Sequence, residues 1–137
     1  MQFDIKDSGG RSLLVVQILG VGSDPDWLQA SLNYEQNGFT ANVEFYLLIG
    51  ELVSFREQLS QLYTTLKGKT VFGNVEDNVS LTFTTDGIGH IKIVGYIRDS
   101  NYMVKTDFEI QSDQTMLPEI LNDCKKILDH YSPQKIK

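Results

Sequence analysis

Two dipeptides, Asn37-Gly38 and Asp86-Gly87, constrain the fold of this chain more than any other feature. Each lies between two runs of residues in which apolar and polar side chains alternate. Glycine adopts a positive φ without a Cβ clash, and Asn or Asp tolerates that region better than most residues, as a tight type I′ turn requires. The two dipeptides therefore predict two β-hairpins within an antiparallel sheet.

Alternation predicts strands on both sides of each turn. Residues 28–34 and 39–47 place apolar side chains on one face and polar side chains on the other. Further strands are expected at residues 3–5, 13–19, 70–72, 79–84, 91–97 and 102–110. One face of such an antiparallel sheet is buried and the other meets water.

Two segments show the spacing of an α-helix instead. The first predicts a helix over residues 50–66, and its apolar stripe consists of Leu52, Phe55, Leu59, Leu62 and Leu66. The second helix is expected after Ser112-Asp113, with Pro118 near its start. The prediction is an α+β fold with an antiparallel sheet of about seven or eight strands. The order is four strands, helix, four strands, helix, with both helices packed on one face.

Size and charge narrow the functional classes. We expect residues 1–137 to form a single domain, with residues 131–137 as a flexible tail. Twelve Lys and Arg against eighteen Asp and Glu give a net charge of −6, which argues against nucleic-acid binding. There is no signal-peptide pattern and no apolar run long enough to cross a bilayer, so we expect a cytoplasmic protein without a membrane partner.

Catalytic and metal-binding patterns are not found. His90 lies on the polar face of a predicted strand, His130 lies near the end of the last helix, and Cys124, the sole cysteine, belongs to an apolar stripe. The acidic segments 24–26 and 76–78 have the composition of turns and lack the ligand order of a calcium loop. We therefore expect neither an enzyme nor a cofactor or metal site.

Several segments together resemble one known family. They are Asp24-Pro25-Asp26-Trp27-Leu28 before a strand, the helix of residues 52–66, the segment Asp86-Gly87-Ile88-Gly89-His90-Ile91, and Phe108-Glu109 leading to residues 113–120. This layout resembles the WapI-type bacterial immunity proteins and their uncharacterised relatives over nearly the whole chain. The sequence departs from the family at Asp26, because an Asn commonly precedes the Trp there.

The resemblance implies a non-catalytic protein that binds and neutralises a cognate toxin of its own cell or kin. An acidic surface suits a basic toxin such as a nuclease. Two contact surfaces are candidates. One is the polar face of the sheet, with Glu35, Glu44, Asp107 and Glu109, and the other is the acidic turns, with Asp24, Asp26, Glu76 and Asp77. The alternative reading of these carboxylates is that they only keep the protein soluble.

The sequence is also compatible with two other functional classes. A small-ligand-binding domain or minor enzyme would have a pocket between sheet and helices, lined by Phe45, Phe83, Tyr102 and Phe108. A scaffold subunit would pair an exposed sheet edge with another chain. The sequence leaves the oligomeric state open.

Overall fold

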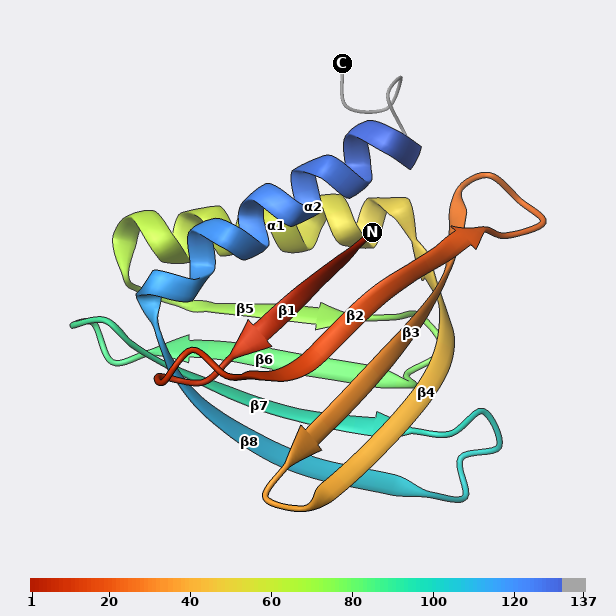
Figure 1. Ribbon diagram of the computed structural model, residues 1–137. Helices are drawn as coiled ribbons and strands as arrows, with labels where there is room; N and C mark the ends of the chain where they lie inside the picture. The colour runs from red at the N-terminus through yellow and green to blue at the C-terminus, as the bar shows by residue number, and fades with distance from the viewer. Residues whose placement is uncertain (132–137) are drawn as a thin grey trace.

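The computed structural model describes residues 1–131 as two four-stranded antiparallel sheets and two α-helices (Figure 1). The first sheet contains, in chain order, β1 (Gln2–Lys6), β2 (Ser12–Val21), β3 (Trp27–Gln36) and β4 (Phe39–Leu48). The second contains β5 (Lys69–Gly73), β6 (Val79–Thr85), β7 (His90–Arg98) and β8 (Lys105–Asp113). Helix α1 (Ile49–Thr65) connects the sheets, and a 3-10 turn (Gln114–Met116) leads into α2 (Leu117–Tyr131). The predicted α+β class and element order are confirmed.

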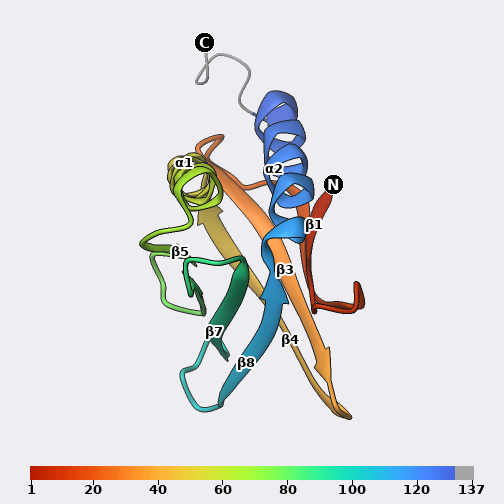
Figure 2. The ribbon, with the colours of Figure 1, turned by 90° about the vertical axis from the view of Figure 1, so that its left-hand side faces the viewer.

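The eight strands form two sheets rather than one continuous sheet, and both helices pack on the same side of the two sheets. Helix α1 packs along β5 and helix α2 along β1, which are edge strands of different sheets (Figure 2). Apolar side chains of both sheets and both helices belong to one buried cluster. The physical reason is that α1 interrupts the run of hairpins, so β5 starts a second sheet whose apolar face packs against the first.

Aromatic side chains fill the interior. The Phe55 ring lies between those of Phe3, Phe72 and Phe83, with centroids 5.1–5.7 Å away, and Tyr34 of the first sheet stacks on Phe108 of the second at 4.2 Å. Three of the four rings predicted to line a pocket, Phe45, Phe83 and Phe108, are therefore buried in the packed core. The fourth, Tyr102, is 53% exposed and lies outside this interior.

Both dipeptides lie in the turns of β-hairpins, but the two turns differ in type. Asn37 and Gly38 adopt φ values of 54° and 84°, as the predicted type I′ turn requires. The prediction of the same turn at Asp86-Gly87 is wrong, because residues 86–89 form a longer loop with positive φ at Gly87 and Gly89. Here the Asp86 carboxylate accepts hydrogen bonds from the backbone of Ile88 and His90, which favours a wider loop.

One strand boundary also differs from the prediction. Strand β8 begins at Lys105, whereas alternation placed its start at Tyr102. The Asp99 carboxylate accepts the N–H groups of Met103 and Val104 at 2.8 Å each, and Tyr102 adopts a left-handed φ of 57°, so residues 99–104 close into a loop. Most of the predicted tail, residues 132–137, lies outside the described residues, and Tyr131 is the last residue of α2. Within residues 1–131 no helix has the length and apolarity to cross a membrane.

Candidate functional site

Three loops from both sheets gather at one end of the molecule, which we call the loop end. They are residues 22–26 between β2 and β3, residues 74–78 between β5 and β6, and residues 99–104 between β7 and β8 (Figure 1). The other strand connections, residues 7–11, 37–38 and 86–89, lie toward the opposite side, which we call the hairpin end. The loop end therefore combines segments that are far apart in the sequence.

Two buried asparagines connect the parts of the loop end. The Asn74 side-chain amide donates to the Tyr46 carbonyl at 3.3 Å, and its Oδ1 accepts the N–H groups of Asn78 and Val79 at 2.8 and 3.1 Å. The Asn78 amide in turn donates to the Arg98 carbonyl at 3.2 Å. Because buried polar groups are costly unless they are hydrogen-bonded, this network holds β4, the 74–78 loop and the end of β7 in one arrangement.

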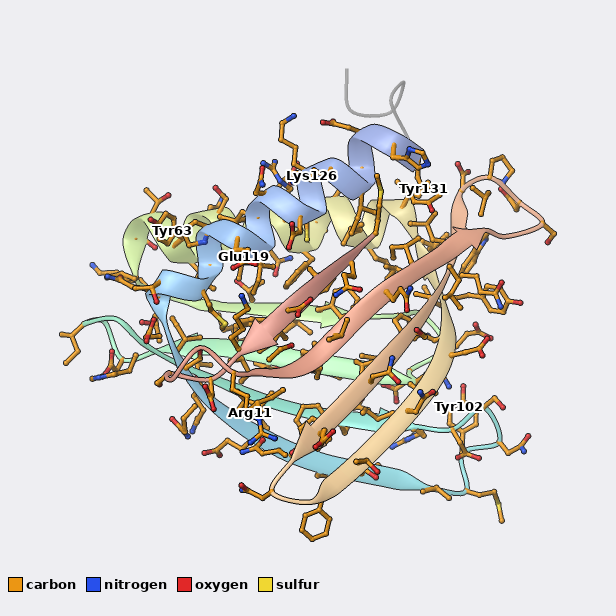
Figure 3. All side chains as sticks on the ribbon, viewed as in Figure 1. Arg11, Tyr63, Tyr102, Glu119, Lys126 and Tyr131 are labelled. Carbon is orange, nitrogen blue, oxygen red and sulfur yellow. The ribbon has the colours of Figure 1, made fainter. Side chains whose placement is uncertain are left out.

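Aromatic and charged side chains add a second set of contacts. The Tyr96 hydroxyl donates to the Asp77 carboxylate, which raises the pKa of Tyr96, and the Tyr102 hydroxyl donates to the Glu76 carbonyl. The Arg98 guanidinium lies 5.6 and 5.8 Å from the ring centroids of Tyr96 and Tyr102 and 3.6 Å from Asp77. The 74–78 loop is thereby joined to the 99–104 loop, from which Tyr102 projects at the edge of the molecule (Figure 3).

The 22–26 loop is fixed by its own turn and by α1. The Asp24 carboxylate accepts the Asp26 N–H at 2.9 Å, and the Asp24 carbonyl accepts the Trp27 N–H at 3.0 Å. The Asp26 carbonyl accepts the N–H of Ile49, the first residue of α1, at 2.9 Å. A Cβ at Gly22 would lie 3.4 Å from the Trp27 Cβ, so the loop passes in close contact with this side chain.

An open depression lies between the 22–26 and 74–78 loops. It is lined by Gly22, Ser23, Asp24, Trp27, Tyr46 and Glu76. Trp27 and Tyr46 occupy the outer face of the first sheet as diagonal neighbours, because Trp27 pairs with Leu48 and Tyr46 pairs with Gln29. Tyr46 is 47% exposed, so its ring is accessible to a partner.

Exposed apolar side chains continue this surface beyond the depression. Val75 and Tyr102 are more than half exposed, and Met103 is 82% exposed. Aromatic residues and Met are enriched in protein interfaces, and neighbouring exposed apolar side chains are typical of interaction sites. The loop end therefore has the mixture of apolar and acidic groups that a protein partner would contact.

The structure brings together four of the eight predicted contact residues. Asp24, Asp26, Glu76 and Asp77 all lie at the loop end. The other four lie on the outer faces of two different sheets: Glu35 and Glu44 on the first, Asp107 and Glu109 on the second. These outer faces point away from each other, because the inner faces share one core (Figure 2).

Sequence reasoning missed Tyr46, Tyr102 and Met103 as parts of this surface. Tyr46 had a detectable signal, because it occupies a polar-face position in an alternating strand. Met103 had the same signal, because alternation placed it on the polar face of a predicted strand, whereas Tyr102 was assigned to the apolar face and had none. The structure thus adds aromatic and apolar groups to a site predicted only from carboxylates.

The environments of Cys124 and of the two histidines do not resemble a catalytic or metal site. Burial raises the pKa of Cys124 to about 12, so the thiol stays protonated at neutral pH and is a poor nucleophile. His90, the first residue of β7, contacts the Asp86 carboxylate, and His130 packs edge-on against the Tyr131 ring. Among residues 1–131 no group of three or more metal-ligating side chains is found.

Comparison with known proteins identifies the family. A family model described as the immunity protein WapI-like family matches residues 4–132. The chain belongs to this family. No curated protein and no solved structure matches it. The WapI-like match includes both sheets and both helices, and it confirms the resemblance drawn from the turn, helix and hairpin segments.

Proposed function

We propose that this protein is a non-catalytic immunity protein that neutralises a cognate toxin by direct contact through its loop end. The observation that carries the proposal is the WapI-like family match over residues 4–132. The gathering of Asp24, Asp26, Glu76 and Asp77 beside exposed aromatic groups supports the choice of surface. Buried surroundings at Cys124 agree with a role that requires no nucleophile.

Electrostatics favour a basic toxin as the partner. The chain carries a net charge of −6, and the loop end exposes carboxylates from two loops. Opposite charges on two proteins steer their encounter and raise the association rate. A toxin that binds nucleic acid must present cations to phosphate. An acidic inhibitor that covers those cations would block substrate binding without any chemical step.

The first experiment tests whether a toxin exists. The product of the adjacent gene is expressed in a host cell with and without this protein, and growth is measured. Protection from growth arrest, together with co-purification of the two proteins, is expected. An adjacent product that neither arrests growth nor binds would contradict the proposal.

The second experiment tests the surface with charge-matched variants. The triple variant Asp24→Asn, Asp26→Asn, Glu76→Gln removes three loop-end charges, and Glu35→Gln, Glu44→Gln, Glu109→Gln removes three charges from the sheet faces. We expect the loop-end variant to associate with the toxin about tenfold more slowly at low salt, and the sheet-face variant to stay within about twofold of the parent. Equal effects would show that net charge, rather than this surface, governs binding.

A further inference from the structure

The depression beside Trp27 has a composition that selects one kind of side chain. Its six lining residues supply two aromatic rings, from Trp27 and Tyr46, and two carboxylates, from Asp24 and Glu76. None of the six is basic. An aromatic face attracts a cation through its quadrupole, and a carboxylate adds a charge-assisted hydrogen bond.

The chemistry favours a guanidinium over an ammonium. A guanidinium is planar, weakly hydrated and carries donors in a fixed fork, so it stacks on rings while bonding to carboxylates at its edge. The same molecule shows this arrangement nearby, where Arg98 lies over the Tyr96 and Tyr102 rings and 3.6 Å from Asp77. The Trp27 depression is lined by residues of the same kinds, and it is open to solvent.

The walls of the depression are held before any partner arrives. The 22–26 loop is bonded to the first residue of α1, and Asn74 joins the 74–78 loop to the Tyr46 carbonyl. A site whose walls are already ordered loses less conformational entropy on binding. Fully desolvated pockets that receive an aromatic or Arg side chain are typical centres of protein interfaces.

We propose that the depression lined by Trp27, Tyr46, Asp24 and Glu76 receives an arginine side chain of the partner protein. This inference rests on the proposed function for the identity of the partner as a toxin. It goes further by assigning the position and chemical class of the central contact. The toxin therefore presents an exposed arginine at its interface, and replacing that arginine weakens the complex more than replacing neighbouring lysines.

The test uses small probes on the whole chain. Acetyl-arginine amide, acetyl-lysine amide and acetyl-citrulline amide are titrated, and the amide and indole N–H resonances are followed by NMR. Trp27 is the sole tryptophan, so its indole signal reports on the depression directly. We expect the arginine probe to shift Gly22, Trp27 and Glu76, and the uncharged citrulline probe to leave them unchanged. Equal shifts with citrulline, or stronger binding of the lysine probe, would overturn the inference.

Variants separate a binding role from a folding role. Glu76→Gln is expected to weaken the arginine probe about threefold, and the exposed Glu57→Gln on α1 is the charge-matched control, expected to have no effect. Tyr46→Phe keeps the ring and retains binding, whereas Tyr46→Thr keeps a strand-forming residue and loses it. Equal loss in Glu57→Gln, or full binding in Tyr46→Thr, would contradict the assignment.

The outcomes distinguish this inference from the proposed function. A toxin that binds and is neutralised, while the arginine probe leaves the depression unchanged, would overturn the arginine assignment alone. An adjacent gene product without toxicity, while the probe binds as expected, would overturn the toxin partner alone and leave a site for a guanidinium.

Discussion

The two ends of the molecule are built by different means. At the hairpin end, the turns are closed mainly by their own residues: Asn37-Gly38 adopts positive φ, and the Asp7 and Asp86 carboxylates accept backbone N–H groups two and four residues further on. At the loop end, Asn74 and Asn78 bind segments that lie up to 28 residues away in sequence. Local closure gives each turn its own stability, whereas the asparagine hydrogen bonds make the 74–78 loop depend on β4 and on the end of β7.

This difference matters for binding. A surface assembled from several loops keeps its shape only when those loops are braced, and the buried amides provide the brace. The loop end also exposes aromatic and acidic groups together, whereas the exposed apolar residues of the hairpin end are separate: Phe39 begins β4 and Ile88 lies in the 86–89 loop. We therefore expect substitutions at the two ends to separate effects on binding of the proposed toxin partner from effects on stability.

The largest effect is expected from removing the brace. Asn74→Ala leaves the N–H groups of Asn78 and Val79 without their side-chain acceptor, and we expect the free energy of unfolding to fall by about 3 kcal/mol. The matched change at the hairpin end, Asn37→Gly, keeps a residue that accepts positive φ and should cost less than about 0.5 kcal/mol. Urea unfolding of both variants measures the difference.

Thiol labelling shows whether that loss is local. Cys124 is buried in α2 and has a raised pKa, so it reacts only when the core opens. In Asn74→Ala we expect hydrogen exchange at residues 74–79 to accelerate more than labelling of Cys124. Equal acceleration at both places would show that the loop end unfolds only with the whole molecule.

The next effect is a loss of affinity at unchanged stability, expected from a substitution of Met103. Met103→Ser removes an apolar side chain that is 82% exposed, so the stability should change by less than about 0.5 kcal/mol. We expect its affinity for the toxin to fall about tenfold, since the loss of an interface anchor costs roughly 1–2 kcal/mol. Ile88→Ser, at a residue 78% exposed on the hairpin end, is the control and should bind normally. Calorimetric titration measures the toxin affinity of both variants. Weaker binding by Ile88→Ser than by Met103→Ser would contradict the assignment of the contact surface to the loop end.

A smaller effect is expected from the type I′ turn. Gly38 has a φ of 84°, where a Cβ is strained although nothing lies within 4 Å of it. Gly38→Ala should therefore cost about 1 kcal/mol of stability through backbone strain alone. Toxin affinity should be unchanged, and a reduced affinity measured at full folding would extend the contact surface to the hairpin end.

The smallest effect is a pH dependence at the hairpin end. The Ile88 N–H and the His90 contacts lower the pKa of Asp86 below its usual value. A carboxyl whose pKa is lowered by folding stabilises the protein above its unfolded pKa of about 4 and loses that contribution as pH falls through the folded pKa. We expect Asp86→Asn to show a smaller loss of stability between neutral and acidic pH than the parent. The free energy of unfolding is measured at several pH values. An equal loss of stability between neutral and acidic pH in both proteins would contradict this.

Most of the fold could be predicted from patterns among residues that are close together in the sequence. The Asn37-Gly38 turn and the alternation from Leu28 to Leu47 depend on neighbouring residues, and both are confirmed. Alternation reports which face of a strand is buried but not which surface buries it, so it did not reveal that the strands divide into two sheets. The strand start at Tyr102 was wrong because the Asp99 carboxylate closes a loop that alternation does not detect.

The candidate site was less predictable for the same reason. Eight acidic residues were named from charge, but only tertiary structure shows that Asp24 and Glu76, from different sheets, line one depression. The braces Asn74 and Asn78 look like ordinary turn residues in the sequence, since Asn is common in turns. Their long-range hydrogen bonds depend on strand packing that no local pattern encodes.

The crossed placement of the helices has a consequence for how the chain can be divided. Helix α2 belongs to the second half of the chain but covers β1 of the first, and α1 belongs to the first half but covers β5 of the second. In each half alone, the edge strand that the other half's helix covers, β1 or β5, would therefore expose apolar side chains to water. Two separately produced fragments, cut between α1 and β5 near Gly68, should remain incomplete alone and reassemble into one particle when mixed, making this chain a natural scaffold for a split reporter.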